Sequence, residues 1–121
     1  MKILVVEDEA AMAAGLKYNF EQEGHEVLVA GDGPTALKLF QEAKPPVDLV
    51  ILDLMLPGMS GYETCTAILR LDKLVPVLVI SAKTLSEDKM HAFDCGTDQY
   101  ITKPFALPEL LNRVKNLLER H

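Results

Sequence analysis

Four short apolar runs, each followed at once by polar residues, constrain the fold of this chain more than any other feature. They span residues 3–6, 47–53, 77–80 and 100–102, and they lead to Glu7-Asp8-Glu9, Asp53, Ser81 and Lys103. Near-continuous apolar runs of this length predict strands that are buried on both faces of a parallel sheet. The carboxyl ends of parallel strands share one edge of the sheet, where ligands bind in open α/β folds. We therefore expect these polar residues to gather at that edge.

Amphipathic segments of helical length alternate with the strands. One helix is expected to end at Gly24, a second to begin near Gly33-Pro34, and three more to span about 61–70, 86–95 and 107–119. Ser86 is the expected N-cap of the helix over 86–95, and Gly96 is expected to end it. Strands are expected at about 2–6, 26–30 and 99–102, with two others that end at Asp53 and Ser81. Five βα units imply an α/β fold, a doubly wound five-stranded parallel sheet with helices on both faces and right-handed crossovers. For the flavodoxin-like strand order 2-1-3-4-5, the switch point lies beside the first and third strands. A chain of 121 residues is expected to form one domain over 1–121.

The periodicity of the helical segments also predicts which of their side chains face the sheet. The residues expected to point inward are Met12, Leu16, Phe20, Ala36, Leu37, Phe40, Cys65, Ile68, Leu69, Leu110, Leu111, Val114, Leu117 and Leu118.

Composition excludes several classes of function. The net charge of -6 and the pI of about 5.0 argue against binding of nucleic acid or an anionic membrane by charge alone. No stretch approaches the roughly 20 apolar residues of a membrane span, and no signal-peptide pattern begins the chain. Cys65 and Cys95 lie far apart without ligand spacing, so we expect free thiols in a reducing, cytoplasmic compartment and no metal site on them.

The acidic residues at the predicted switch point indicate a particular chemistry. Glu7 and Asp8 follow the first strand and Asp53 ends the third, so the three carboxylates are expected to meet. Because like charges in one cleft repel, the site requires a cation, and oxygen ligands favour Mg²⁺ over zinc. Ser81 adds a hydroxyl and Lys103 a positive charge. This set suits phosphoryl transfer in which Asp53 is the nucleophile and becomes an aspartyl phosphate.

The chain resembles the receiver domain of two-component response regulators over essentially its whole length. The matching stretches are Ile3-Leu4-Val5-Val6-Glu7-Asp8-Glu9, Asp53-Leu54-Met55-Leu56-Pro57-Gly58-Met59-Ser60-Gly61, Ser81-Ala82 and Asp98-Gln99-Tyr100-Ile101-Thr102-Lys103-Pro104-Phe105. Each stretch is weak alone, but their order and spacing together are specific. The stretch Glu109-Leu110-Leu111-Asn112-Arg113-Val114 is similar to the OmpR/PhoB type, whose receivers precede a winged-helix DNA-binding domain. The resemblance implies either a receiver taken from such a longer regulator or a stand-alone one.

The resemblance implies a role for each matching residue and Mg²⁺ as the cofactor. It makes Asp53 the phosphoacceptor, Glu7 and Asp8 the metal-site acids, the Met55 carbonyl a further ligand, Ser81 the switch hydroxyl, Lys103 the phosphate-binding lysine and Tyr100 the switch aromatic. The family often has two aspartates where this chain has Glu7 and Asp8, and the longer glutamate leaves room for a bridging water. The Lys103–Pro104 peptide is expected to be cis, although only about 5–6% of X-Pro bonds in folded proteins are.

Partners and an output follow from the same resemblance. A sensor histidine kinase supplies the phosphoryl group, the receiver slowly hydrolyses it, and a conformational shift controls an output, expected to be transcription. Activated receivers of this type form a homodimer through the fourth helix, fifth strand and fifth helix. The implied contacts pair Lys89 with Glu109, Asp98 with Arg120 and Gln99 with Arg113. Because Gln99 is neutral and exposed pairs contribute only about 0–1 kcal/mol each, we expect a weakened dimer.

Other readings of the same residues compete with this one. A haloacid-dehalogenase-type phosphatase needs a second Asp two residues after its nucleophile, where this chain has Met55. A flavodoxin-like cofactor binder needs a Ser/Thr-rich phosphate loop after the first strand, where acidic residues 7–9 would repel a flavin phosphate. Asp53 and Ser81 could also be caps, and Tyr100 could be plain strand packing. A degenerate receiver that acts only as a protein-interaction module stays open as the alternative.

Overall fold

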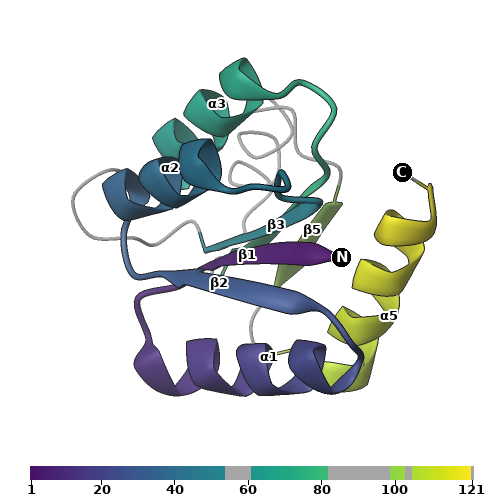
Figure 1. Cartoon of the computed structure of the whole chain (residues 1–121). Helices are drawn as coiled ribbons and strands as arrows, with labels where there is room; N and C mark the ends of the chain where they lie inside the picture. Colours follow the sequence, from purple (N-terminus) through teal and green to yellow (C-terminus); the bar gives the residue numbers. More distant parts are fainter. Residues whose placement is uncertain (54–60, 82–98, 103–104, 121) are drawn as a thin grey trace.

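The sheet lies at the centre of the molecule and has the predicted topology. The computed structural model describes residues 1–53, 61–81, 99–102 and 105–120. Its strands are β1 (Lys2–Val6), β2 (Glu26–Ala30), β3 (Leu49–Asp53), β4 (Val77–Ser81) and β5 (Gln99–Thr102). They form one sheet in the order β2-β1-β3-β4-β5, and every neighbouring pair is parallel (Figure 1). The predicted α/β fold with strand order 2-1-3-4-5 is therefore confirmed.

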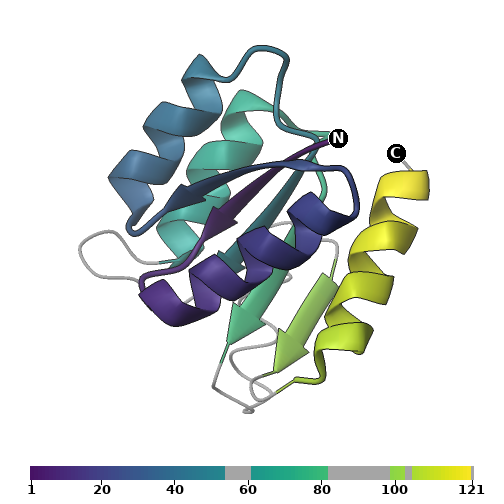
Figure 2. The same ribbon diagram turned by 60° about the horizontal axis from the view of Figure 1, so that its bottom comes forward.

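Helices cover both faces of this sheet. The described helices are α1 (Ala10–Gln22), α2 (Gly33–Glu42), α3 (Gly61–Leu71) and α5 (Leu107–Arg120). Figures 1 and 2 show α2 and α3 on one face and α1 and α5 on the other. The helix predicted at about 86–95, with its cap at Ser86 and its end at Gly96, lies outside the described residues. No helix in the described part of the chain is long and apolar enough to cross a membrane.

Side chains that alternate along the buried strands build two cores. In β1, Leu4 and Val6 belong to the core on the α2–α3 side, whereas Ile3 and Val5 belong to the core on the α1–α5 side. The helices contribute Ala36, Cys65 and Ile68 to the first core and Leu16, Phe20, Leu110, Val114, Leu117 and Leu118 to the second. These positions were predicted to face inward. At the margins of the helical stripes, Met12, Leu37, Phe40, Leu69 and Leu111 are half-buried and pack against the same two cores, so they also face inward.

The end of α1 is set by a glycine, as the sequence predicts. Gly24 has a φ of 90°, which a residue without a Cβ adopts at little cost. Its N–H donates to the Glu21 carbonyl at 3.0 Å, and the N–H of His25 donates to the Phe20 carbonyl at 3.1 Å. This pair of bonds is the Schellman arrangement, which satisfies carbonyls that the helix end would otherwise leave unbonded. The chain thereby turns directly into β2.

The start of α2 is fixed by a side-chain cap. The Asp32 Oδ1 atom accepts a hydrogen bond from the Thr35 N–H at 2.7 Å, and a proline occupies the first turn, as predicted from Gly33-Pro34. The bond from the Thr35 backbone favours the charged carboxylate and lowers the pKa of Asp32. Sequence and structure therefore agree on where α2 begins.

Opposite charges meet at the amino end of the sheet, an arrangement that the sequence analysis did not predict. The Lys2 N–H donates to the Asp48 Oδ2 atom at 2.7 Å, and the Asp48 N–H donates to the Lys2 carbonyl at 2.7 Å. The Lys2 side chain is only 8% exposed, and its Nζ lies 3.2 Å from Glu26 Oε2. Its hydrocarbon stem is thus buried while its ammonium group stays paired. We call Lys2, Glu26 and Asp48 the amino-edge cluster.

Candidate metal centre at the carboxyl edge of the sheet

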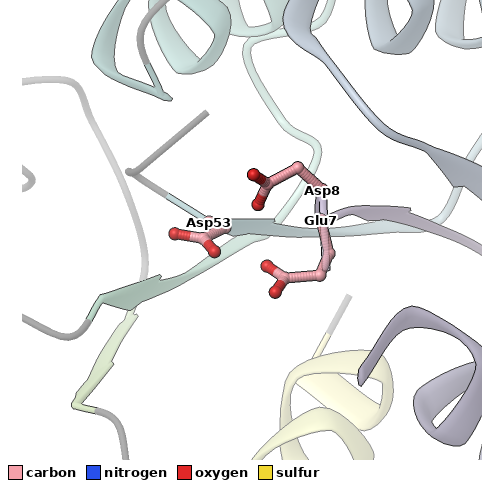
Figure 3. Close-up of side chains that lie close together, drawn as sticks. All are labelled: Glu7, Asp8 and Asp53. Atoms are coloured by element: carbon pink, nitrogen blue, oxygen red, sulfur yellow. The ribbon is translucent and has the colours of Figure 1, made fainter. Parts of the chain in front are cut away.

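The three acids predicted at the switch point lie together. β1 and β3 are neighbours, with Val6 opposite Leu52, so Glu7 and Asp53 each come one residue further along the pair. Ligand oxygens of Glu7, Asp8 and Asp53 all lie within 4.8 Å of one another. Figure 3 shows the carboxylates converging on a common space at the ends of the two strands. We call these three residues the acidic cluster.

The backbone holds the acidic cluster at the edge of the sheet. The Glu7 N–H donates to the Ala30 carbonyl at 2.9 Å, which extends the pairing of β1 with β2 by one residue. Asp53 is the last residue of β3 and pairs with Ile80 of β4. Glu7 and Asp53 are therefore positioned by main-chain ladders, which are more rigid than loops.

Burial makes the acidic cluster electrostatically costly. Glu7 is 4% exposed and Asp53 is 3% exposed, whereas Asp8 is exposed to solvent. Carboxylates with little contact with water repel each other more strongly than they would at an open surface. A divalent cation between them would offset both the repulsion and the lost hydration. Since the converging donors are all carboxylate oxygens, the set fits a hard cation such as Mg²⁺ better than a soft one.

The strand beside β3 carries Ser81, one of the residues predicted to complete the site. Ser81, one residue after the partner of Asp53, pairs with Thr102 at the end of β5. The fold thus brings Ser81 to the carboxyl edge on the strand beside Asp53, as the sequence predicts. Its hydroxyl group, and the whole of Met55 and Lys103, lie outside the described residues, as does the Lys103–Pro104 peptide.

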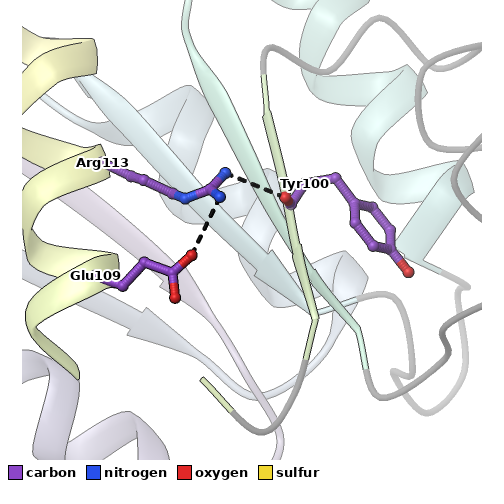
Figure 4. A network of polar contacts seen from close by, with 3 residues as sticks. All are labelled: Tyr100, Glu109 and Arg113. Atoms are coloured by element: carbon purple, nitrogen blue, oxygen red, sulfur yellow. Dashed lines mark hydrogen bonds and ion pairs between the residues drawn. The ribbon is translucent and has the colours of Figure 1, made fainter. Parts of the chain in front are cut away.

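A polar network ties α5 to β5. The Arg113 Nη1 atom donates to the Tyr100 carbonyl at 3.3 Å, and its Nη2 donates to the Glu109 Oε1 atom at 3.2 Å (Figure 4). Figure 4 shows the Tyr100 ring on the opposite side of β5 from α5. Tyr100 as a whole is 9% exposed and belongs to the core on the α2–α3 side. One residue of β5 thus connects its backbone to α5 and its side chain to the opposite layer.

The contact between Arg113 and the Tyr100 carbonyl was missed at the sequence level. The spacing of Glu109 and Arg113 by four positions in a helix does carry a signal for their ion pair. No comparable signal marks a side-chain bond to a strand carbonyl, because that bond depends on how the helix is set against the sheet.

The match to a known family agrees with this arrangement of strands and acids. Residues 3–115 match the family described as the response regulator receiver domain. The chain belongs to this family. Its members take part in two-component signalling and interact with histidine kinases.

Two individual relatives indicate which type of response regulator this receiver domain is similar to. It is 42% identical to the Bacillus subtilis protein named alkaline phosphatase synthesis transcriptional regulatory protein PhoP, with 98% of this chain matching 49% of that protein. It is also 42% identical to the sensory transduction protein RegX3 of Mycolicibacterium smegmatis, with 98% of this chain matching 50% of that one. Both are regulators of the OmpR/PhoB type, as the resemblance indicated. The chain spans about half the length of the curated relatives it matches.

A solved structure supports the same placement. The receiver domain of the Francisella response regulator 1452 is 36% identical and superposes with a TM-score of 0.88, covering 98% of this chain and 97% of that one. Because the superposition covers nearly all of both chains, the two domains share the same overall fold.

The residues expected to form a dimer are only partly visible in this receiver. Glu109 and Arg113 are on α5 and contact each other within the chain. The side chains of Gln99 and Arg120, and the whole of Lys89 and Asp98, lie outside the described residues. The three predicted pairs therefore remain predictions.

Proposed function

We propose that this receiver accepts a phosphoryl group on Asp53 and acts as a phosphorylation switch. The supporting observation is the acidic cluster, in which Asp53 is 3% exposed and lies with Glu7 and Asp8 at the carboxyl edge. An Asp53 carboxylate oxygen attacks the phosphorus atom and forms an acyl phosphate, while the bond from phosphorus to the donor breaks and the leaving group keeps the bonding electrons. Water later attacks the phosphorus, the bond from phosphorus to the Asp53 oxygen breaks, and inorganic phosphate leaves while the carboxylate is regenerated.

Glu7 and Asp8 would hold the cation that this transfer requires. When bound, Mg²⁺ neutralises charge on the phosphoryl oxygens and orients the group for in-line transfer. Glu7 and Asp8 come from consecutive positions after β1, so one carboxylate is buried and the other faces solvent. Glu7 would then bind the cation directly or through a water, and Asp8 would bind it from the solvent side. By resemblance, the Met55 carbonyl completes the protein ligands.

The transmission of the signal is proposed from the family. Ser81 and Lys103 would donate charge-assisted hydrogen bonds to the phosphoryl oxygens, and the movement of Ser81 would change the packing around Tyr100. Tyr100 lies in β5 beside Val79 of β4, so a shift at the end of β4 reaches it through a neighbouring strand. Ser81→Ala is then expected to bind Mg²⁺ and accept phosphate but to transmit it poorly.

The partners and the context of the switch complete the proposal. A sensor histidine kinase is the donor, residues 1–121 form one receiver domain, and a DNA-binding domain outside this chain carries the transcriptional output. The names of the two curated relatives, a transcriptional regulator and a sensory transduction protein, support this reading. The buried free thiol of Cys65 is consistent with a reducing cytoplasm.

Dimerisation after phosphorylation is proposed through residues of β5, α5 and the segment between β4 and β5. Lys89, Asp98, Gln99, Glu109, Arg113 and Arg120 are the residues assigned to this dimer face. In the described structure the Arg113 guanidinium is already engaged by Glu109 and the Tyr100 carbonyl, with side-chain exposures of 37% for Arg113 and 50% for Glu109. The neutral Gln99 of a partner has no charge to draw Arg113 away from these contacts, so Gln99→Asp should tighten the phosphorylated dimer. Lys89→Glu should weaken it, because Lys89 is expected to pair with Glu109 of the partner. Sedimentation of the phosphorylated variants measures both changes.

Intact-mass spectrometry with a small acyl-phosphate donor tests the central step. The wild-type chain is expected to gain one phosphoryl group in the presence of Mg²⁺ and none in chelator, and Asp53→Asn should gain none in either condition. Asp32→Asn is a matched control, because Asp32 is an acid of the same edge that caps α2, and it should be labelled like the wild type. Labelling in chelator, or labelling of Asp53→Asn at the same site, would contradict the proposal. Failure of the wild type to be labelled would favour the degenerate receiver.

A further inference from the structure

Two exposed leucines, Leu71 at the last position of α3 and Leu74 three residues later, lie at the amino end of the sheet. Within the described residues, the large hydrophobic side chains that are exposed are Met1, Tyr18, Val29, Leu71 and Leu74. Two of these five lie within four positions of each other, and Leu74 is 82% exposed, more than any of the others. A single exposed leucine needs no explanation, but a concentration of apolar surface marks an interaction site.

A groove lies beside these leucines. It has a volume of about 370 Å³ and runs between the ends of α2 and α3, where Phe40, Ala43, Pro46, Val47 and Leu71 provide its apolar lining. Asp72 also lines it, and the Asp72 Oδ1 atom accepts a hydrogen bond from the Leu74 N–H at 2.9 Å, so Leu74 is anchored next to the groove. Since a cavity of about 150 Å³ accommodates benzene, the groove has room for a leucine side chain.

The charges around the groove allow two identical chains to meet there. The whole chain has a net charge of -6, so two copies repel each other over most of their surface. Over residues 41–48 and 70–75, however, the acids Glu42, Asp48 and Asp72 are matched in number by the bases Lys44, Arg70 and Lys73. This balance, three against three, makes the α2–α3 face (residues 40–48 and 70–75) neutral and lets each rim present both signs to a second copy.

We propose that the α2–α3 face pairs with the same face of a second copy of this chain, with each Leu74 inserted into the groove of the other. A two-fold contact requires a self-complementary surface, and a protruding leucine next to a groove of sufficient size provides one. The face lies at the amino end of the sheet, so pairing leaves the acidic cluster of both copies accessible. It needs neither phosphate nor Mg²⁺ and is independent of the proposed function.

Sedimentation of the unphosphorylated chain in chelator, over a series of concentrations, tests this pairing. A weak dimer is expected, with a Kd of roughly 0.1 to 1 mM, because the contact is small. Leu74→Asp should weaken it at least about tenfold, since both leucines leave the contact. Ala43→Lys, which fills the groove, should do the same. Tyr18→Asp, an equivalent change at a 63% exposed aromatic on α1, should leave the Kd unchanged.

The double variant Leu74→Asp with Ala43→Lys decides whether these two positions meet. In a two-fold contact the new aspartate of one copy faces the new lysine of the other, so the double variant should dimerise more tightly than either single variant. A double variant no tighter than the single ones would overturn the proposal. A chain that stays monomeric at every concentration would also overturn it. This includes the case in which the NMR amide signals of residues 40–48 shift only when an acidic amphipathic peptide is added, because the face would then bind another protein rather than a second copy.

Discussion

The two ends of the sheet treat charge in opposite ways. At the amino end, the amino-edge cluster pairs an ammonium group with a carboxylate and gives the Asp48 carboxylate a backbone N–H. At the carboxyl end, the acidic cluster brings three carboxylates within 4.8 Å. β1 contributes to both, with Lys2 at one end and Glu7 just beyond the other. The same strand therefore joins a paired set of charges at one end to a cluster of like charges at the other.

The difference identifies the carboxyl end as the place where the proposed function would lower stability. Charges at the amino end satisfy backbone groups and each other, which is the arrangement expected of a stable protein. The acidic cluster instead brings like charges together, and local departures of this kind are expected at functional sites. The contrast predicts that neutralising an acid lowers stability at the amino end and raises it at the carboxyl end.

The largest effect is expected from breaking the amino-edge cluster. Asp48→Ala leaves the Lys2 N–H, which belongs to a residue only 7% exposed, without its acceptor. The free energy of unfolding should fall by about 1.5 kcal/mol, as for other buried donors that lose a charged acceptor. Urea denaturation measures it. Glu26→Gln serves as the control, because that side chain is 64% exposed and its pairing contributes less than about 1 kcal/mol. Equal losses in both variants would contradict this account.

Neutralising an acid of the acidic cluster is expected to raise the free energy of unfolding. In chelator, Asp53→Asn should raise the free energy of unfolding by about 1 kcal/mol, because one of three adjacent negative charges is removed. Added Mg²⁺ should reverse the order: at ten times its Kd it stabilises the wild type by about 1.4 kcal/mol and the variant by much less. Thermal melts with and without Mg²⁺ measure both effects. An Asn variant less stable than the wild type in chelator would show that the cluster is structural rather than strained.

A smaller effect concerns pH at the amino end. Burial is the main cause that lowers the pKa of His25, helped by the terminal amine and opposed by Glu23 and Asp48. Because the folded state then binds a proton less readily than the unfolded state, stability is full above about pH 6.5 and falls as the pH drops through that value. His25→Phe keeps the ring contact with Phe20 and should flatten this dependence. Denaturation of the wild type and the variant at pH 5.5 and 7.5 measures how stability changes with pH. A variant with the same pH dependence as the wild type would show that His25 is not its cause.

The smallest predicted effect concerns Asp32, which differs from the residues of the acidic cluster. Both belong to the carboxyl end, but the Asp32 carboxylate accepts the Thr35 N–H, and this bond lowers the pKa of Asp32. The stabilisation is therefore present above about pH 4, the value for the unfolded chain, and is lost as the pH falls further. Asp32→Asn keeps the cap and should make acid unfolding slightly less steep below pH 4. Acid unfolding of the variant as steep as that of the wild type would contradict this prediction.

Much of the fold and the central part of the site could be predicted because both depend on local patterns. The run that ends at Asp53 fixes a strand and its last residue together, and the strand order then brings Asp53 to Glu7 and Asp8. The burial of Lys2 could not be predicted, since a lysine that begins a strand is usually exposed. Its pairing partner Glu26 and backbone partner Asp48 come from two other strand beginnings that only the finished sheet brings together. The link from Arg113 to Tyr100 depends in the same way on tertiary contact.

The position of β3 next to β1 has a consequence for how this protein is made. Ile3 pairs with Leu49, and all three residues of the acidic cluster are synthesised by position 53, well before β5 and α5. Chains grow from the amino terminus at about 5–20 residues per second, which separates the two events by several seconds. The nascent chain therefore carries all three carboxylates before it carries Tyr100 and Arg113. The acidic cluster is thus translated before the elements proposed to report its state.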